Sequence, residues 1–265
     1  MKKKNPIRLV SLRCISIICI IALGLATFVG CGGGGDDGQT PSPVTNQSIG
    51  GIWEGTFFSI PLSRTFITIG LASENSEVHF ISNEGAQYTG IATVSGDSVS
   101  GTFNVFAPPN YVFPDGSTHG TAIINGIIIE RQSLDGTYSG LGDSGNFSLT
   151  YNTLYDRDSS LSLLEGQWFL GTINGIAVNI LLTIQNDGTV TGNDLDGNTY
   201  NGTFTIIDSN YNLYKVNVNI TDINGHSYIY SGLTGLADQS TKNDIFYFGV
   251  TYSNIASVAG RFVKQ

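Results

Sequence analysis

The chain has 265 residues, with 12 basic and 21 acidic side chains and a formal net charge of −9. This acidic balance excludes binding to nucleic acid through a basic patch. It predicts solubility and repulsion from anionic surfaces, and it points to no particular partner.

The first 30 residues have the pattern of an export signal. Five basic residues fall within the first 13 positions, and an apolar run follows from Cys14 to Val29. A basic segment, an apolar segment and a small residue before the cut are typical of a secretory signal peptide. We therefore expect residues 1–30 to be removed. The alternative is an uncleaved membrane anchor, for which the run is short because a span needs about 20 residues.

The segment Phe28-Val29-Gly30-Cys31 resembles the lipobox of bacterial lipoproteins, although that family usually has Leu in place of Phe28. The resemblance implies that Cys31 carries the lipid, including palmitate, and becomes the new N-terminus. The next residue is Gly32 and not Asp, which by similarity to the enterobacterial sorting pattern implies the outer membrane. The expected partner of this end is therefore the membrane, through the lipid on Cys31.

Residues 31–48 are predicted to form a flexible tether, because four glycines and a Thr-Pro-Ser-Pro segment cannot bury a core. Removal of the export signal would also remove Cys14 and Cys19. The mature chain would then keep 7 basic against 21 acidic residues and no cysteine pair for a disulfide.

From residue 49 onward the sequence has the texture of short β-strands. Runs rich in Val, Ile, Thr, Tyr and Phe are separated by turn signals, and Val216, Val218 and Ile220 alternate with polar residues. Signals of this kind, which favour two-residue hairpins, include Asn83-Glu84-Gly85, Ser95-Gly96-Asp97, Asn125-Gly126, Asp135-Gly136, Asn174-Gly175, Asn186-Asp187-Gly188, Asp196-Gly197 and Asn224-Gly225. The pattern predicts an all-β chain of antiparallel hairpins.

An internal repeat divides this region. Gly51-Ile52-Trp53 is echoed by Gly166-Gln167-Trp168, and Tyr88-Thr89-Gly90 is echoed by Tyr200-Asn201-Gly202. We expect two tandem domains at residues 49–156 and 160–265, each a meander β-barrel of seven or eight short strands. The alternative is one long sandwich with coincidental echoes.

The Gly-x-Trp motif on each first strand resembles the opening motif of calycins, the barrel superfamily of lipocalins and avidins. The resemblance implies that Trp53 and Trp168 close the barrel ends. It also implies that a basic residue of the last strand lies across the indole, and Arg261 occupies such a place in the second half. An arginine there would gain a cation–π attraction.

Few residues suggest catalysis or metal binding. His79, His119 and His226 have no paired spacing, and we expect them to face solvent. Gly142-Asp143-Ser144-Gly145 resembles a protease fragment but is interpreted as a turn. The segment 194–198 favours a hairpin turn over a loose calcium site. We therefore predict no enzyme, no metal and no cofactor.

One long loop, residues 106–116, stands apart because it has three prolines and the aromatic residues Phe106, Tyr111 and Phe113. These aromatics are expected either to plug the barrel mouth or to form a binding surface. A barrel of this size is expected to be filled by side chains, which disfavours an interior cavity.

The sequence therefore predicts a non-enzymatic cell-envelope lipoprotein, a binding or interaction module that uses its barrel-end loops and whose partner is an unknown protein or a small apolar ligand. A carrier of a small apolar ligand and a structural envelope component are the alternatives.

Overall fold

The structure is a computed structural model that describes residues 45–265, which belong to one compact unit. The predicted signal peptide, Cys31 and nearly all of the predicted tether lie outside these residues. No helix within residues 45–265 has the length and apolar character needed to cross a bilayer.

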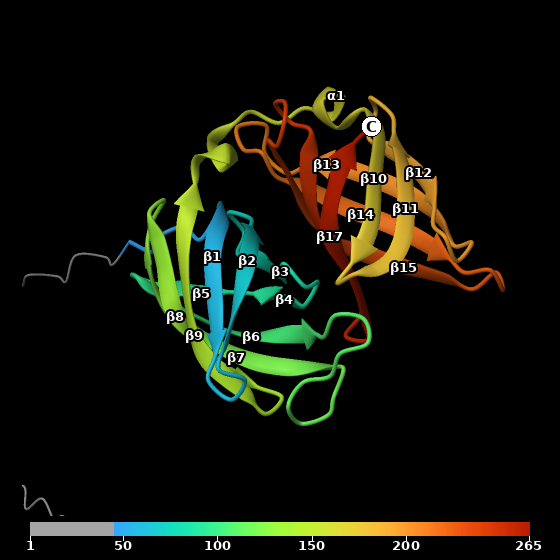
Figure 1. Ribbon diagram of the computed structural model, residues 1–265. Coiled ribbons are helices and arrows are strands. Elements are labelled where there is room, and N and C mark those ends of the chain that lie inside the picture. Colours follow the sequence, from blue (N-terminus) through green and yellow to red (C-terminus); the bar gives the residue numbers. More distant parts are fainter. Residues whose placement is uncertain (1–44) are drawn as a thin grey trace, which may run out of the picture. The chain divides into compact units, whose positions relative to one another are not determined.

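The first half forms a closed antiparallel barrel (Figure 1). Strands that are neighbours in sequence pair with each other, except β4 and β5; β9 returns to β1, and β4 pairs with β6 to close the ring. The short β5 continues β4 past Ala92 along the same edge of β6. The strands are β1 (Gly51–Ser59), β2 (Arg64–Ala72), β3 (Glu77–Ser82), β4 (Gln87–Ile91), β5 (Thr93–Ser95), β6 (Ser98–Phe106), β7 (His119–Ile129), β8 (Ser133–Gly140) and β9 (Asp143–Asn152).

The second half forms another closed barrel of eight antiparallel strands in sequence order, with β17 returning to β10. A 3₁₀ turn (Thr153–Asp156) and the short helix α1 (Leu161–Leu164) connect the barrels. The strands are β10 (Gly166–Ile173), β11 (Ile176–Ile184), β12 (Thr189–Asn193), β13 (Thr199–Ile206), β14 (Tyr214–Thr221), β15 (Ser227–Ala237), β16 (Ile245–Tyr252) and β17 (Ala256–Lys264). The prediction of two tandem antiparallel meander barrels is confirmed.

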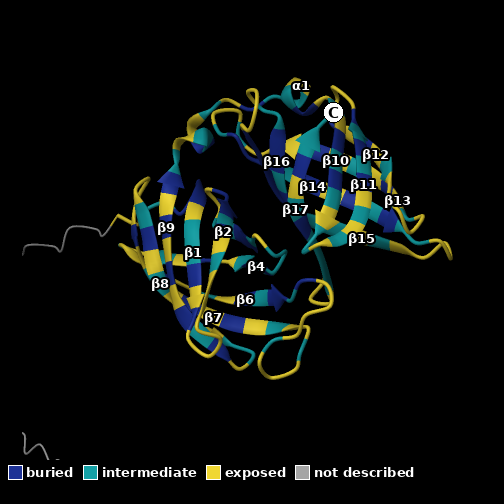
Figure 2. Ribbon diagram, in the orientation of Figure 1, coloured by how far each residue is buried: buried dark blue, intermediate teal, exposed yellow. Residues whose placement is uncertain are grey.

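Alternation of side chains builds each core. Along β9 the odd-numbered positions are buried and most of the even-numbered ones are open to solvent, a striping visible in Figure 2. Because successive side chains of a strand point to opposite faces, Phe147, Leu149 and Tyr151 face inward together. Burial of such faces is the main stabilising contribution to each barrel.

The two tryptophans occupy matching places. Both are fully buried on the first strand of their barrel. Trp53 donates its indole N–H to the carbonyl of Ile49 at 3.0 Å, and Trp168 donates to that of Leu164 at 2.7 Å. Each bond satisfies a buried polar group with the segment that enters the strand. The repeat seen in the sequence therefore has a structural counterpart.

Two predicted turns are wrong. Gly126 and Gly136 lie inside β7 and β8, directly opposite each other, and the turn between these strands falls at residues 130–132. A Cβ on Gly136 would lie 2.6 Å from the ring of Phe147, so the glycines make room for an aromatic ring. Asn174-Gly175 is a hairpin turn as predicted, with φ of 51° and 77°.

The outer face of β2–β4 packs against the second barrel. A Cβ on Gly249 would lie 2.9 Å from Ile81, so this glycine allows close approach. Lys215 donates to both carboxylate oxygens of Glu77, at 2.7 and 2.8 Å. His79, which was expected to face solvent, is buried here, where its Nδ1 accepts from the Gln87 amide at 2.8 Å and its Nε2 lies 3.2 Å from Glu77.

Candidate functional site

The loop between β6 and β7 is held in place by its own backbone. The amide of Ala107 donates to Thr118 at 2.8 Å, and that of Phe113 donates to Ser117 at 2.8 Å. The amide of Asp115 donates to Leu141 in the β8–β9 turn at 3.2 Å. Residues 107–118, which we call the mouth loop, are therefore fixed against the barrel rim.

A cavity of about 300 Å³ lies beneath the mouth loop, inside the first barrel. Inward residues of β1 to β4 form its wall, and residues of the mouth loop form its cover. Aromatic side chains make up much of the lining, namely Phe57, Phe66, Phe80, Tyr88, Tyr111, Phe113 and Tyr138. The expectation of a filled barrel therefore fails at this end, while the tryptophan end is packed.

Three of these rings meet at the base of the cavity. The ring centroid of Phe57 lies 5.4 Å from that of Tyr88 and 5.3 Å from that of Tyr138. Tyr88 and Tyr138 meet edge to face at 5.9 Å. Mutual packing of this kind fixes the rings, so the cavity wall is formed before any ligand arrives.

A carboxylate lies among these aromatic residues. Asp143, the first residue of β9, lines the cavity and is only 8% exposed. Its Oδ1 accepts from the Ser59 hydroxyl at 2.6 Å and from the Ser144 amide at 2.8 Å. Its Oδ2 accepts one longer bond, from the Tyr138 hydroxyl at 3.2 Å. Oδ2 therefore retains capacity to accept another hydrogen bond.

The two tyrosines beside Asp143 stay protonated. Burial raises the pKa of Tyr138 far above its ordinary value, and the nearby Asp143 carboxylate raises it further. Burial also raises the pKa of Tyr88, with smaller contributions from Tyr138 and Asp143. Within residues 45–265 the Tyr88 hydroxyl has no hydrogen-bond partner, so the cavity has a free phenol group.

The cavity rim combines one ion pair with exposed apolar groups. Arg64 is the one basic residue of the lining, and its guanidinium pairs with Glu84. Leu62, Tyr111 and Val112 also line the cavity, and they are 52%, 49% and 60% exposed. The rim therefore presents apolar surface to solvent next to a neutralised charge pair.

The matching position of the second barrel is arranged differently. Tyr200, which repeats Tyr88, is 5% exposed and donates its hydroxyl to Asp194 at 2.9 Å. The counterpart of the mouth loop is the tight turn at residues 222–226 between β14 and β15. At the tryptophan end of the second barrel, Phe246 packs against Trp168, Phe204, Phe248 and Phe262.

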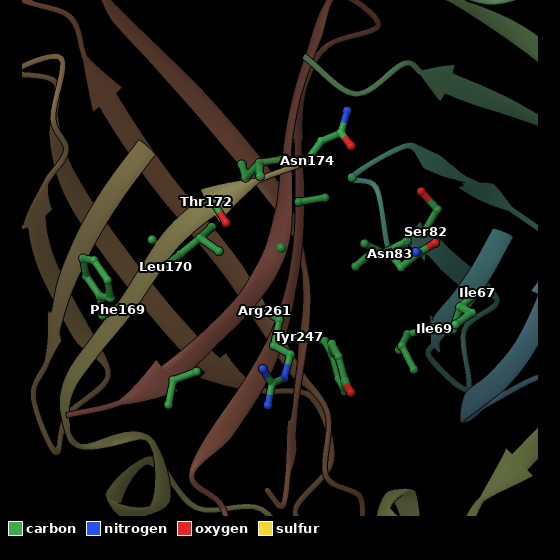
Figure 3. Close-up of a pocket in the computed structure, with 17 residues that line it drawn as sticks. Ile67, Ile69, Ser82, Asn83, Phe169, Leu170, Thr172, Asn174, Tyr247 and Arg261 are labelled. Carbon is green, nitrogen blue, oxygen red and sulfur yellow. The ribbon is translucent and has the colours of Figure 1, made fainter. Parts of the chain in front are cut away.

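Figure 3 shows a larger cavity, of about 540 Å³, formed by outer faces of strands. Ile67 and Ile69 of β2 line one side, and Phe169, Tyr247 and Arg261 line the other. Ile67 is 61% exposed, so this cavity is an open groove. It lies outside both barrel interiors and has no buried carboxylate.

The structure distributes the predicted loop aromatics over different places. Tyr111 and Phe113 line the cavity, with Tyr111 half exposed. Phe106 is buried at the end of β6 and is not part of the cavity lining. Val105 lies on the inward face of β6, and its neighbour Phe106 therefore points to the outer face, away from the cavity. The mouth loop therefore covers the cavity without filling it.

The basic residue over the second tryptophan is Lys264, and not Arg261 as predicted from the sequence. The Lys264 ammonium lies 5.1 Å from the Trp168 ring centroid, and the two residues are opposite each other on β17 and β10. Arg261 pairs instead with Gln239. Arg261 precedes the buried Phe262 and therefore points outward, whereas Lys264 shares the inward face of Phe262.

Asp143 was missed as a site residue because its surroundings were interpreted as a turn. Its position on the inward period of β9, two residues before Gly145 and four before Phe147, was the signal that could have placed it inside. In the second barrel, Asp194 accepts from the amides of Asp196 and Asn198 at 3.0 and 2.9 Å. Its segment is a hairpin turn, as the sequence favoured.

Comparisons of the chain with protein-family models, curated proteins and solved structures give no match.

Proposed function

We propose that the protein binds a small, largely apolar molecule in the cavity of the first barrel. The observation that carries this proposal is the preformed cavity of about 300 Å³, walled by aromatic rings and covered by the mouth loop. Small-molecule sites are concave, mostly apolar, and have a few fixed polar groups. This cavity has those properties, with Asp143, Tyr138 and Tyr88 as its polar groups.

The size of the cavity limits the ligand. At about 300 Å³ it is at the lower end of known ligand pockets, so it suits a single substituted ring or a short branched chain. Because the wall rings are packed against one another, binding costs little ordering of the protein. The ligand displaces water from aromatic surface, which is the expected driving force.

The test is calorimetric titration of the protein with neopentylbenzene, a neutral compound of suitable size. Ala107 lines the cavity, and Ala107→Trp should fill it and abolish binding. The matched control is Ala177→Trp at an exposed position of β11, which should bind as the unaltered protein does. Absence of saturable binding by the unaltered protein, or equal binding by both variants, would contradict the proposal.

A second candidate function is the docking of a protein partner onto the rim. It is favoured by the exposed apolar residues Leu62, Tyr111 and Val112, which extend the cavity lining into solvent. A rim partner should lose affinity with the pair Leu62→Ser and Val112→Ser, whereas the small probe inside the cavity should not. Co-purification from envelope extracts with and without these substitutions separates the two functions.

For the location of the protein, we propose a lipid-anchored protein of the bacterial outer membrane, with Cys31 as the lipidated residue. The N-terminal sequence supports this, through its basic segment, its apolar run and the lipobox-like Phe28-Val29-Gly30-Cys31. Metabolic labelling with a palmitate analogue should mark the protein, and Cys31→Ser should lose the label. Labelling that survives Cys31→Ser would contradict the assignment.

We also propose kinship with the calycin barrels. Support comes from the closed eight-stranded meander, the buried tryptophan on each first strand and the cation of Lys264 over Trp168. A solved structure of the protein, compared in strand order and barrel stagger with calycins, is the direct test.

A further inference from the structure

The buried carboxylate of Asp143 has no positive partner. Among residues 45–265, its hydrogen bonds come from two hydroxyls and one amide, all neutral. The single basic side chain of the cavity lining, Arg64, is engaged by Glu84 at the rim. A charge that is removed from water is stabilised best by an opposite charge, so the cavity has an unmet preference for a cation.

The aromatic walls have the same preference. The faces of aromatic rings carry negative electrostatic potential and attract ammonium groups within about 6 Å of the ring centroid. Phe57, Tyr88 and Tyr138 meet at centroid distances of 5.3 to 5.9 Å, and Tyr138 itself bonds Asp143. A small cation next to Asp143 would therefore lie within reach of several rings.

We propose that the ligand of this cavity is a small organic monocation, an amine or quaternary ammonium on an apolar body. Its charged group lies against Oδ2 of Asp143 and the aromatic rings, and its apolar part lies under the mouth loop. An ammonium that carries a proton also donates to the free Tyr88 hydroxyl. This inference rests on the proposed function and names the class of ligand that the same site selects.

The charge of the whole chain supports the choice of sign. With 12 basic and 21 acidic residues, the protein concentrates cations near its surface and repels anions. An anionic ligand, such as a fatty acid, would place its charge next to a buried carboxylate. Neutral ligands gain the apolar contacts alone.

The experiment compares two isosteric probes, benzyltrimethylammonium and neopentylbenzene, by calorimetric titration of the protein. They have the same shape and differ in the charged nitrogen. We expect benzyltrimethylammonium to bind about tenfold or more tightly than neopentylbenzene. Added salt should weaken the binding of the cation and leave that of the neutral probe unchanged.

Substitutions test which residues cause the preference of the cavity for a cation. Asp143→Asn keeps the size and the acceptor oxygen, and it should lose the preference for the cation, so that the two probes bind with similar affinity. The control is Asp194→Asn, which alters a carboxylate–tyrosine pair of the second barrel and should keep the preference. Tyr88→Phe leaves the Asp143 bonds intact, so it supplies a second variant should Asp143→Asn fail to fold. It should lower the affinity for benzylammonium, which can donate to that hydroxyl, more than for benzyltrimethylammonium.

The outcomes separate the two proposals. Tighter binding of the neutral probe, or a cation preference that persists in Asp143→Asn, would overturn the inference and leave the proposed function standing. Failure of both probes to bind would overturn both. The quaternary ammonium group could belong to a free small molecule or to the choline headgroup of a lipid. Flotation with phosphatidylcholine vesicles against phosphatidylglycerol vesicles tells these sources apart, because only the headgroup source predicts retention by the former.

Discussion

The two barrels share a strand order and a tryptophan anchor, and they differ at the opposite end. In the first barrel a twelve-residue loop covers a cavity, and the Tyr88 hydroxyl is free. In the second barrel a tight turn occupies the matching connection, and the hydroxyl of Tyr200 is bonded to Asp194. Two barrels with the same strand order and the same tryptophan anchor therefore differ at this end in the length of one connection and in the partner of one tyrosine hydroxyl.

The largest loss of stability is expected when the buried tryptophan that the two barrels have in common is removed. Trp53→Ala and Trp168→Ala should each lower the free energy of unfolding by about 3–5 kcal/mol, because each removes a fully buried ring and leaves a cavity. Denaturant unfolding measures both losses. A loss below about 1 kcal/mol for either variant would break the equivalence of the two anchors.

The next largest effect is a difference in stability between a substitution in the second barrel and one in the mouth loop of the first barrel. Phe248→Ser, in the packed interior of the second barrel, should cost about 3–5 kcal/mol. Phe113→Ser, in the mouth loop, should cost about 1 kcal/mol or less, because the ring covers a cavity and is partly exposed. Thermal and denaturant unfolding of the two variants should separate them clearly. Equal losses would mean that the mouth loop is a structural plug.

A smaller effect concerns the ion pair that joins the barrels. Burial acts to raise the pKa of Glu77, but hydrogen bonds from His79 and Lys215 outweigh it and lower that pKa to about 2. A lowered pKa gives stability that is present above the unfolded value of 4.5 and is lost as the pH falls toward 2. With allowance for solvent screening, we expect a loss of about 2 kcal/mol over that range.

Unfolding measured between pH 5 and pH 2 should therefore show less acid destabilisation in Glu77→Gln than in the unaltered protein. Lys215→Met should weaken the same pH dependence from the other side of the pair. An unchanged profile in both variants would mean that the pair does not couple the barrels.

The smallest effect is expected at the basic residue over Trp168. Lys264→Met keeps the apolar stem and removes the cation over Trp168, which should cost about 0.5–1 kcal/mol. Arg261→Met, on the outward face, is the matched control and should change stability by about 0.5 kcal/mol or less. A larger loss for Arg261→Met would restore Arg261 as the closing residue.

The fold could be predicted because alternation and turn residues act locally. The same local signals misplaced Gly126 and Gly136, since a glycine that makes room for the Phe147 ring looks identical in sequence to one that makes a turn. The site was harder to predict because it depends on what surrounds Asp143 in space. Ser59, Tyr138 and Tyr88 come from three strands, and only barrel closure brings them together.

The most direct test of this account is chemical-shift mapping of the protein with neopentylbenzene. We expect saturable shifts at Phe57, Tyr88, Tyr138 and the mouth loop, with the interior of the second barrel unchanged. Saturable shifts centred on Trp168 and Phe246, or no saturable shifts at all, would contradict the claim that the ligand binds under the mouth loop of the first barrel.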